Sequence, residues 1–116
     1  MSSIRIGGAS LNQTPIDWDN NLSNILEAIE EARTLGVKVL CLPELCITGY
    51  GCEDLFLSEW VPETAMHMLM SIVPKSKGIC VAVGLPFRKE NNLYNVTCMV
   101  QNERILGFYA KQILAN

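Results

Sequence analysis

The sequence lacks the features that mark nucleic-acid-binding and membrane proteins. Nine Lys and Arg are outnumbered by twelve Asp and Glu, which leaves a net charge of −3 and no basic stripe to follow phosphates. No apolar run approaches the roughly 20 residues that span a bilayer, and the opening MSSIRIGG has neither the basic start nor the hydrophobic length of a secretory signal. We therefore expect a cytoplasmic protein that binds neither nucleic acid nor membranes.

The sequence is also poor in features that hold metals or form disulfides. Its five cysteines are odd in number, none is spaced C-x-x-C, and the single histidine, His67, has no second ligand at metal spacing. Most of the cysteines lie in apolar runs, where a free thiol behaves as a small hydrophobic group. They are interpreted as reduced and mainly structural, and no metal site is expected.

Residues 1–116 contain no repeat, low-complexity tract or linker, so one domain is expected. Apolar residues recur at helical spacing from Leu22 to Ala32 and from Ala65 to Val73. Apolar runs indicate strands, and alternation after Leu93 indicates a hairpin. The predicted strands cover 4–11, 37–42, 78–86, 93–100 and 104–109, with a polar connection at 87–92. This order predicts an α/β layered sheet whose first strands are parallel and whose last strands are antiparallel.

A carboxylate follows the second predicted strand, in the stretch CLPELCITGY. Pro43 prevents that strand from continuing, and ligands of open α/β sheets collect at the carboxyl ends of strands, so Glu44 is expected at the rim of a crevice. Lys111 directly follows the last predicted strand and can project at the same rim. Each residue has an ordinary alternative, because Glu44 can cap a backbone amide or pair with a surface lysine, and Lys111 can be simply solvated.

Three segments resemble those of the nitrilase, or carbon-nitrogen hydrolase, superfamily. VLCLPELCITGY is similar to that family's strand ending in L-P-E-L, and LYNVTCMVQNERILGFYAKQIL is similar to its hairpin. The acidic pair in TGYGCEDLFL resembles the version found in the N-terminal glutaminase domain of glutamine-dependent NAD+ synthetases. The resemblance covers nearly the whole chain and implies the N-terminal part of an α-β-β-α sandwich, incomplete in this chain.

The resemblance also implies amide hydrolysis through a thioester by a Glu, Lys and Cys triad. Carried over, Glu44 is the general base, Lys111 stabilises the oxyanion, and Asn95 gives structural support to the hairpin. Tyr50 is part of a glutamine pocket or, equally, an aromatic lid on the sheet. The implied substrates are glutamine in this domain, and deamido-NAD+ and ATP, with Mg²⁺, in a synthetase domain that is absent here. No cofactor is expected in this chain, and a homo-oligomer is expected.

One member of the triad is missing from the expected place. The family's nucleophilic cysteine follows the lysine, whereas all five cysteines here precede Lys111. Neither Cys46 nor Cys52 is assigned that role, and Cys46 is expected to pack with its apolar neighbours. The nucleophile is expected beyond Asn116, and the 116-residue chain alone is expected to be inactive. An incomplete sheet is also expected to expose an edge at 104–109 and to associate.

Other functions are less compatible with the residues. A βαβ module that binds dinucleotides would carry G-x-G-x-x-G or a P-loop, and GGASLNQTPID is neither. A non-catalytic interaction domain, with Glu44 and Lys111 as an ordinary ion pair, remains an alternative. Within the superfamily, another amidase or a carbamoyl hydrolase is the nearest competitor.

Overall fold

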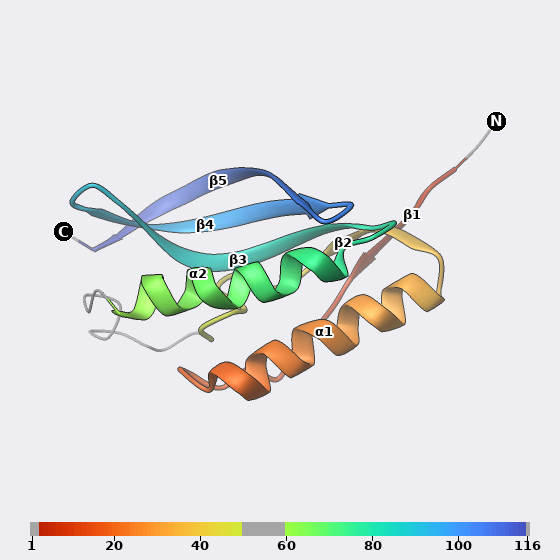
Figure 1. Cartoon of the computed structure of the whole chain (residues 1–116), viewed down its shortest axis with the longest axis horizontal. Helices are drawn as coiled ribbons and strands as arrows, with labels where there is room; N and C mark the ends of the chain where they lie inside the picture. Colours follow the sequence, from red (N-terminus) through yellow and green to blue (C-terminus); the bar gives the residue numbers. More distant parts are fainter. Residues whose placement is uncertain (1–2, 50–59, 116) are drawn as a thin grey trace.

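The computed structural model describes residues 3–49 and 60–115, with the backbone alone for 112–115. The described elements are β1 (Arg5–Gly8), α1 (Trp18–Thr34), β2 (Val37–Cys41), α2 (Trp60–Ile72), a 3-10 turn (Val73–Lys75), β3 (Cys80–Lys89), β4 (Asn92–Gln101) and β5 (Arg104–Ala115). The described strands form one sheet in the order β1-β2-β3-β4-β5 (Figure 1). The β1, β2 and β3 strands run parallel, while β3, β4 and β5 form an antiparallel meander. The predicted α/β order and strand directions are therefore confirmed.

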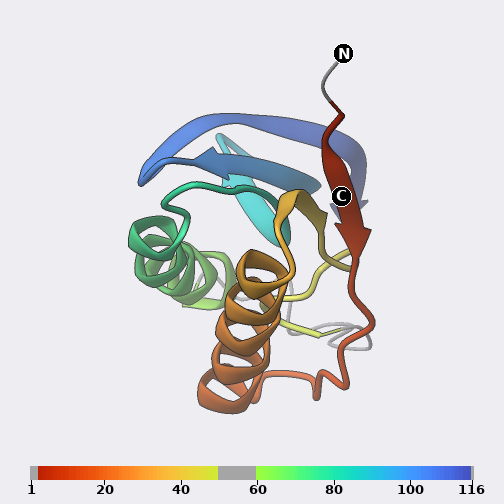
Figure 2. The same cartoon turned by 90° about the vertical axis from the view of Figure 1, so that its right-hand side faces the viewer.

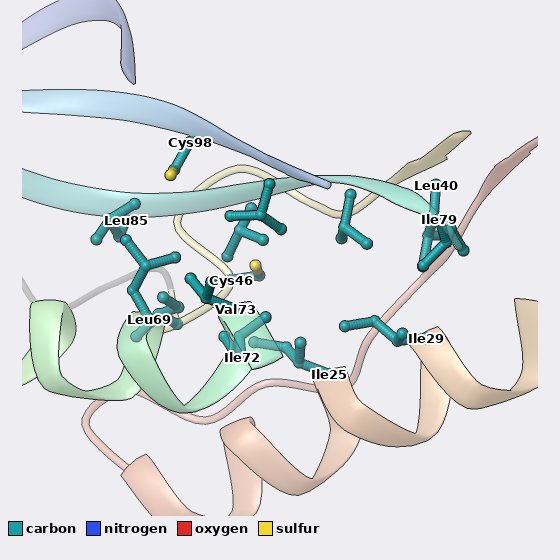
Figure 3. Packing of buried hydrophobic residues seen from close by; sticks show 14 of the residues in the cluster. Ile25, Ile29, Leu40, Cys46, Leu69, Ile72, Val73, Ile79, Leu85 and Cys98 are labelled. Atoms are coloured by element: carbon teal, nitrogen blue, oxygen red, sulfur yellow. The ribbon is translucent and has the colours of Figure 1, made fainter. Parts of the chain in front are cut away.

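Both helices cover the same face of the sheet, as Figure 2 shows. The α1 helix packs on β2 and the α2 helix packs on β3, so each crossover helix lies against the strand that follows it. Their apolar stripes meet the inward residues of the strands in one continuous core (Figure 3). Its members include Ile25, Ile29, Leu40, Cys46, Leu69, Ile72, Val81, Val83, Leu85, Val96, Cys98 and Val100.

The helix starts and ends follow local sequence signals. Trp18 and Trp60 are the first residues of the two helices, and their rings meet edge to face with centroids 6.4 Å apart. Gly36 adopts φ +77° just after α1, a left-handed conformation that glycine takes without steric cost. Pro74 lies in the 3-10 turn after α2, where its ring prevents the α-helix from continuing.

In three strands an end differs from the prediction by at least three residues. The first strand is shorter than 4–11, because only Arg5–Gly8 is paired with the short β2. The third strand runs past residue 86 into the segment predicted as a polar connection, since antiparallel pairing with β4 continues to Lys89 and Asn92. The last strand extends to Ala115, so Lys111 lies within β5 rather than after it.

The far edge of the sheet exposes apolar side chains, as predicted. Leu106, Phe108 and Tyr109 on β5 are exposed, and β5 is the last strand in the sheet order. Within the part of the chain that the structure describes, no helix has the length and apolar character needed to cross a membrane.

Candidate active site

Glu44 begins a tight turn at the carboxyl end of β2. The strand ends at Cys41, and Leu42 still donates its N–H to the Ala82 carbonyl at 3.1 Å before Pro43 redirects the chain. The turn is closed by the Gly49 N–H, which donates to the Leu45 carbonyl at 2.8 Å. Leu45 adopts φ +52°, an uncommon conformation for leucine, and its side chain is buried. The sequence therefore places a carboxylate on a buried and conformationally defined turn.

The Glu44 turn packs against Gly84 of β3. Its neighbours Val83 and Leu85 point into the helix-side core, so its own side-chain position faces the opposite side of the sheet. A Cβ at that position would lie 2.5 Å from the Leu45 N and 3.1 Å from the Glu44 carbonyl carbon. The Gly84 carbonyl also accepts the Ile47 N–H at 3.1 Å. Gly84 thus allows the turn to approach the strand and anchors it there.

A buried amide on α1 holds the other side of the turn. Asn21 is fully buried, and its Nδ2 donates to the Thr14 and Ile47 carbonyls at 2.8 and 3.2 Å. Its Oδ1 accepts the Thr14 N–H at 3.0 Å. Gln13 adds a hydrogen bond from Nε2 to the Cys46 carbonyl at 2.7 Å. These contacts connect the start of α1, the preceding loop and the Glu44 turn.

Asn21→Ala is expected to reduce the free energy of unfolding by about 2–3 kcal/mol, because backbone groups of Thr14 and Ile47 lose their partner. Urea unfolding of the protein measures this change. The neighbouring Asn20 is exposed, and Asn20→Ala is expected to stay within ~0.5 kcal/mol of wild type. Equal urea midpoints for the two variants would contradict the role given to Asn21.

Lys111 reaches Glu44 from the edge strand. Asn95 pairs with Gln112 and Val96 pairs with Ala110, so the register shift between them leaves Lys111 as the extra residue of a β-bulge. The Lys111 Nζ donates to the Glu44 Oε2 at 2.9 Å, across 67 residues of sequence. The structure therefore brings together the two residues that the sequence singled out, and among the described residues the hydrogen-bond partner of Glu44 is this lysine rather than a backbone amide.

The lysine keeps Glu44 ionised. The hydrogen bond from Lys111 lowers the pKa of the Glu44 carboxyl, partial burial opposes this, and the nearby Asn95 amide lowers the pKa further. Because the folded-state pKa is depressed, the pair stabilises the fold above the ordinary carboxyl pKa and loses that contribution as the pH falls through the folded value. The Glu44 side chain is 31% exposed and that of Lys111 is 48% exposed, so a reactant can reach the pair.

Two of the described cysteines, Cys46 and Cys98, are unsuited to nucleophilic attack. Cys46 lies two residues after Glu44, but burial raises the pKa of its thiol to about 12, and its Sγ points to the Gly84 carbonyl. Burial also raises the pKa of Cys98 to about 11. The prediction that Cys46 packs in the core is confirmed, and Cys52 lies outside the described residues.

Two further points about the site concern the predicted pocket residue and possible metal ligands. Tyr50, the predicted pocket residue, lies outside the described residues. Within residues 3–49 and 60–115, no three His, Cys, Asp or Glu side chains are grouped so that they could hold a metal ion. Among the described residues, Glu44 and Lys111 form an ion pair at this end of β2, and the Asn95 amide acts on the same carboxylate.

Comparison with known proteins shows the family to which the chain belongs. The sequence model of the carbon-nitrogen hydrolase family matches residues 5–115. The chain belongs to this family. Over 118 residues it is 36% identical to a glutamine-dependent NAD(+) synthetase of Oryza sativa subsp. indica. This alignment covers 100% of this chain and 16% of the relative. It is 33% identical over 115 residues to the synthetase of Homo sapiens, and this alignment covers 97% of this chain and 16% of the relative.

Solved structures show the same fold. A glutamine-dependent NAD(+) synthetase from Cytophaga hutchinsonii is 59% identical, with a TM-score of 0.94 over 99% of this chain and 20% of that one. An amidase from Nesterenkonia sp. is 22% identical, with a TM-score of 0.79 over 97% of this chain and 44% of that one, and supports the fold alone. The carbon-nitrogen hydrolase chain described here spans about 16% of the length of its curated relatives.

Proposed function

We propose that this chain is part of the glutaminase domain of a glutamine-dependent NAD+ synthetase, in which Glu44 and Lys111 act on the side-chain amide of glutamine. The observation that carries the proposal is the 2.9 Å contact between these two residues, at the end of β2 in a carbon-nitrogen hydrolase fold. The 59% identity to a synthetase of this kind supports glutamine over other amides as substrate.

Glu44 has the protonation state that a general base needs. A thiol with a pKa of about 8.5 is mostly protonated at neutral pH and requires an acceptor as it attacks the amide carbon. A glutamate carboxyl is ionised at this pH, the lowered pKa of Glu44 favours that state further, and Glu44 takes the proton of the thiol. It then returns the proton to the departing ammonia as the C–N bond breaks and leaves a thioester. Water then attacks the thioester carbon, the C–S bond breaks, and glutamate and the free thiol are released.

Lys111 supplies positive charge where negative charge develops. The former carbonyl oxygen becomes an oxyanion in the tetrahedral intermediate, and a fixed ammonium group is suited to stabilise it. The bulge in β5 fixes the ammonium on the same carboxylate that moves the proton. One ion pair therefore serves both the proton transfer and the charge development.

The remaining parts of the reaction belong to segments other than the described residues. We assign the nucleophilic thiol to a cysteine that follows Lys111 in the complete protein, so the 116-residue chain alone is expected to be inactive. Tyr50 is proposed to contact the glutamine. The ammonia would serve an ATP- and Mg²⁺-dependent amidation of deamido-NAD+ in a synthetase domain. A homo-oligomer and a cytoplasmic location stay predictions.

The test is to assay the complete protein that carries this chain with deamido-NAD+, ATP and Mg²⁺, using either glutamine or ammonia as nitrogen source. NAD+ formation from both sources, with glutamate released from glutamine, is the expected result. Use of ammonia alone would contradict the glutaminase assignment. Faster hydrolysis of simple aliphatic amides or carbamoyl compounds than of glutamine would instead support another amidase of the family.

A further inference from the structure

Asn95 occupies the position in β4 that lies between the two elements of the candidate site. On one side it pairs with Pro86 of β3, two residues beyond Gly84, on which the Glu44 turn rests. On the other side it pairs with Gln112 of β5, directly beside the bulged Lys111. Paired residues of neighbouring strands project to the same face, so Asn95 and Gly84 share the face on which Glu44 lies.

The side chain of Asn95 is buried without a hydrogen bond to any described residue. It is 1% exposed, and neither its Nδ2 nor its Oδ1 forms a hydrogen bond with the described part of the chain. Buried polar groups are nearly always paired, because desolvation of an unpaired amide is unfavourable. An amide in this state requires an explanation other than packing, since an apolar side chain would occupy the position with less cost.

Glu44 has an acceptor that matches this amide. Its Oε2 is used by Lys111, whereas its Oε1 has no hydrogen bond to a described residue. The Asn95 amide lowers the pKa of this carboxylate, although the two side chains do not form a full hydrogen bond. Contacts of this kind in an active site without substrate are often long and tighten in the substrate complex.

We propose that Asn95 is a positioning residue for Glu44: its Nδ2 donates to the Oε1 of the carboxylate while Lys111 holds the Oε2. With one donor from β4 and one from β5, the carboxylate can neither rotate nor withdraw from the reacting thiol and amide. The inference rests on the proposed function, since it assigns a role relative to Glu44 as general base. It changes Asn95 from a residue that supports the hairpin to one that acts on the reaction through another side chain.

The experiment replaces Asn95 by Leu, and separately by Ala, in the complete synthetase. Loss of a hydrogen bond to a charged group is expected to lower kcat/KM for glutamine by about 10- to 100-fold. Because the amide favours the ionised form of Glu44, its removal raises the carboxyl pKa, and the acidic limb of the kcat/KM profile is expected to move to higher pH. Lys111 is the charged group that acts on Glu44 among the described residues, and it is unchanged in both variants.

Controls separate this role from a structural one. Gln101 lies on the same strand at its far end, and Gln101→Met is expected to keep wild-type glutamine hydrolysis and pH profile. If the Asn95 amide only fills space, Asn95→Leu would be neutral or stabilising, with activity within about two-fold of wild type and an unshifted acidic limb. That result, or loss of folding in both variants by circular dichroism, overturns the inference. A wild-type protein that does not hydrolyse glutamine overturns the proposed function itself.

Discussion

Glu44→Gln is expected to lower glutamine-dependent NAD+ formation by the complete protein by about 10²- to 10⁴-fold, the range that a general acid–base group contributes. The glutamine side chain introduced at position 44 has the same shape as that of glutamate but cannot accept the proton of the attacking thiol. It also removes the negative partner of Lys111, which lies 2.9 Å away in the wild type. Formation of NAD+ from ammonia does not use this step and is expected to be unchanged.

The two nitrogen sources make this expectation specific. An unfolded variant would lose cooperative unfolding as well as activity, whereas a chemical defect leaves the melting curve and the ammonia-dependent rate intact. Glu63, which is exposed in the first turn of α2, offers a matched control, and Glu63→Gln is expected to behave as wild type with both sources. If Glu44→Gln retains wild-type use of glutamine, Glu44 and Lys111 form an ordinary ion pair.

The position of Glu44 could be predicted from sequence because its causes are local. A β-branched strand followed by proline must stop, and the side chain after that proline therefore lies at the carboxyl end of the sheet. The order of the elements was predictable for a similar reason, since helical and alternating periods change at clear turn residues such as Gly36. The resemblance to the carbon-nitrogen hydrolases then connected Glu44 with Lys111, which spacing alone could not do.

The supports of the site depend on tertiary contacts and were missed. Asn21 looks like one of several polar residues near a helix start, and its burial becomes evident only when the loop at Thr14 and the turn at Ile47 meet it. The bulge that releases Lys111 follows from pairing between β4 and β5, so the strand was predicted to end before that residue. Gly84 did carry a signal, since a glycine within an apolar strand indicates close approach of another backbone.

Among the glycines of the described strands, Gly84 is the one at which substitution by alanine is expected to disturb the site most. Its Cβ would lie 2.5 Å from the Leu45 N and 2.9 Å from the Pro43 carbonyl oxygen, and both are backbone atoms that cannot rotate away. The turn must therefore shift, at a cost of about 1–3 kcal/mol, which is typical of overpacking. A displacement of about 1 Å at a catalytic group can lower the rate by about 10²-fold, and this loss is expected for glutamine hydrolysis.

A second glycine distinguishes the contact from the general effect of adding a methyl group to a strand. Gly107 of β5 has no atom within 4 Å of its would-be Cβ, so Gly107→Ala is expected to keep activity and to be neutral or slightly stabilising. The assay measures glutamine- and ammonia-dependent NAD+ formation together with the midpoint of urea unfolding for both variants. Gly84→Ala should lose the glutamine-dependent rate by a larger factor than its modest destabilisation explains, because the displaced turn carries Glu44 away from the Lys111 ammonium. If Gly84→Ala matches Gly107→Ala in both measurements, the turn tolerates the added methyl group and Gly84 does not determine the position of Glu44.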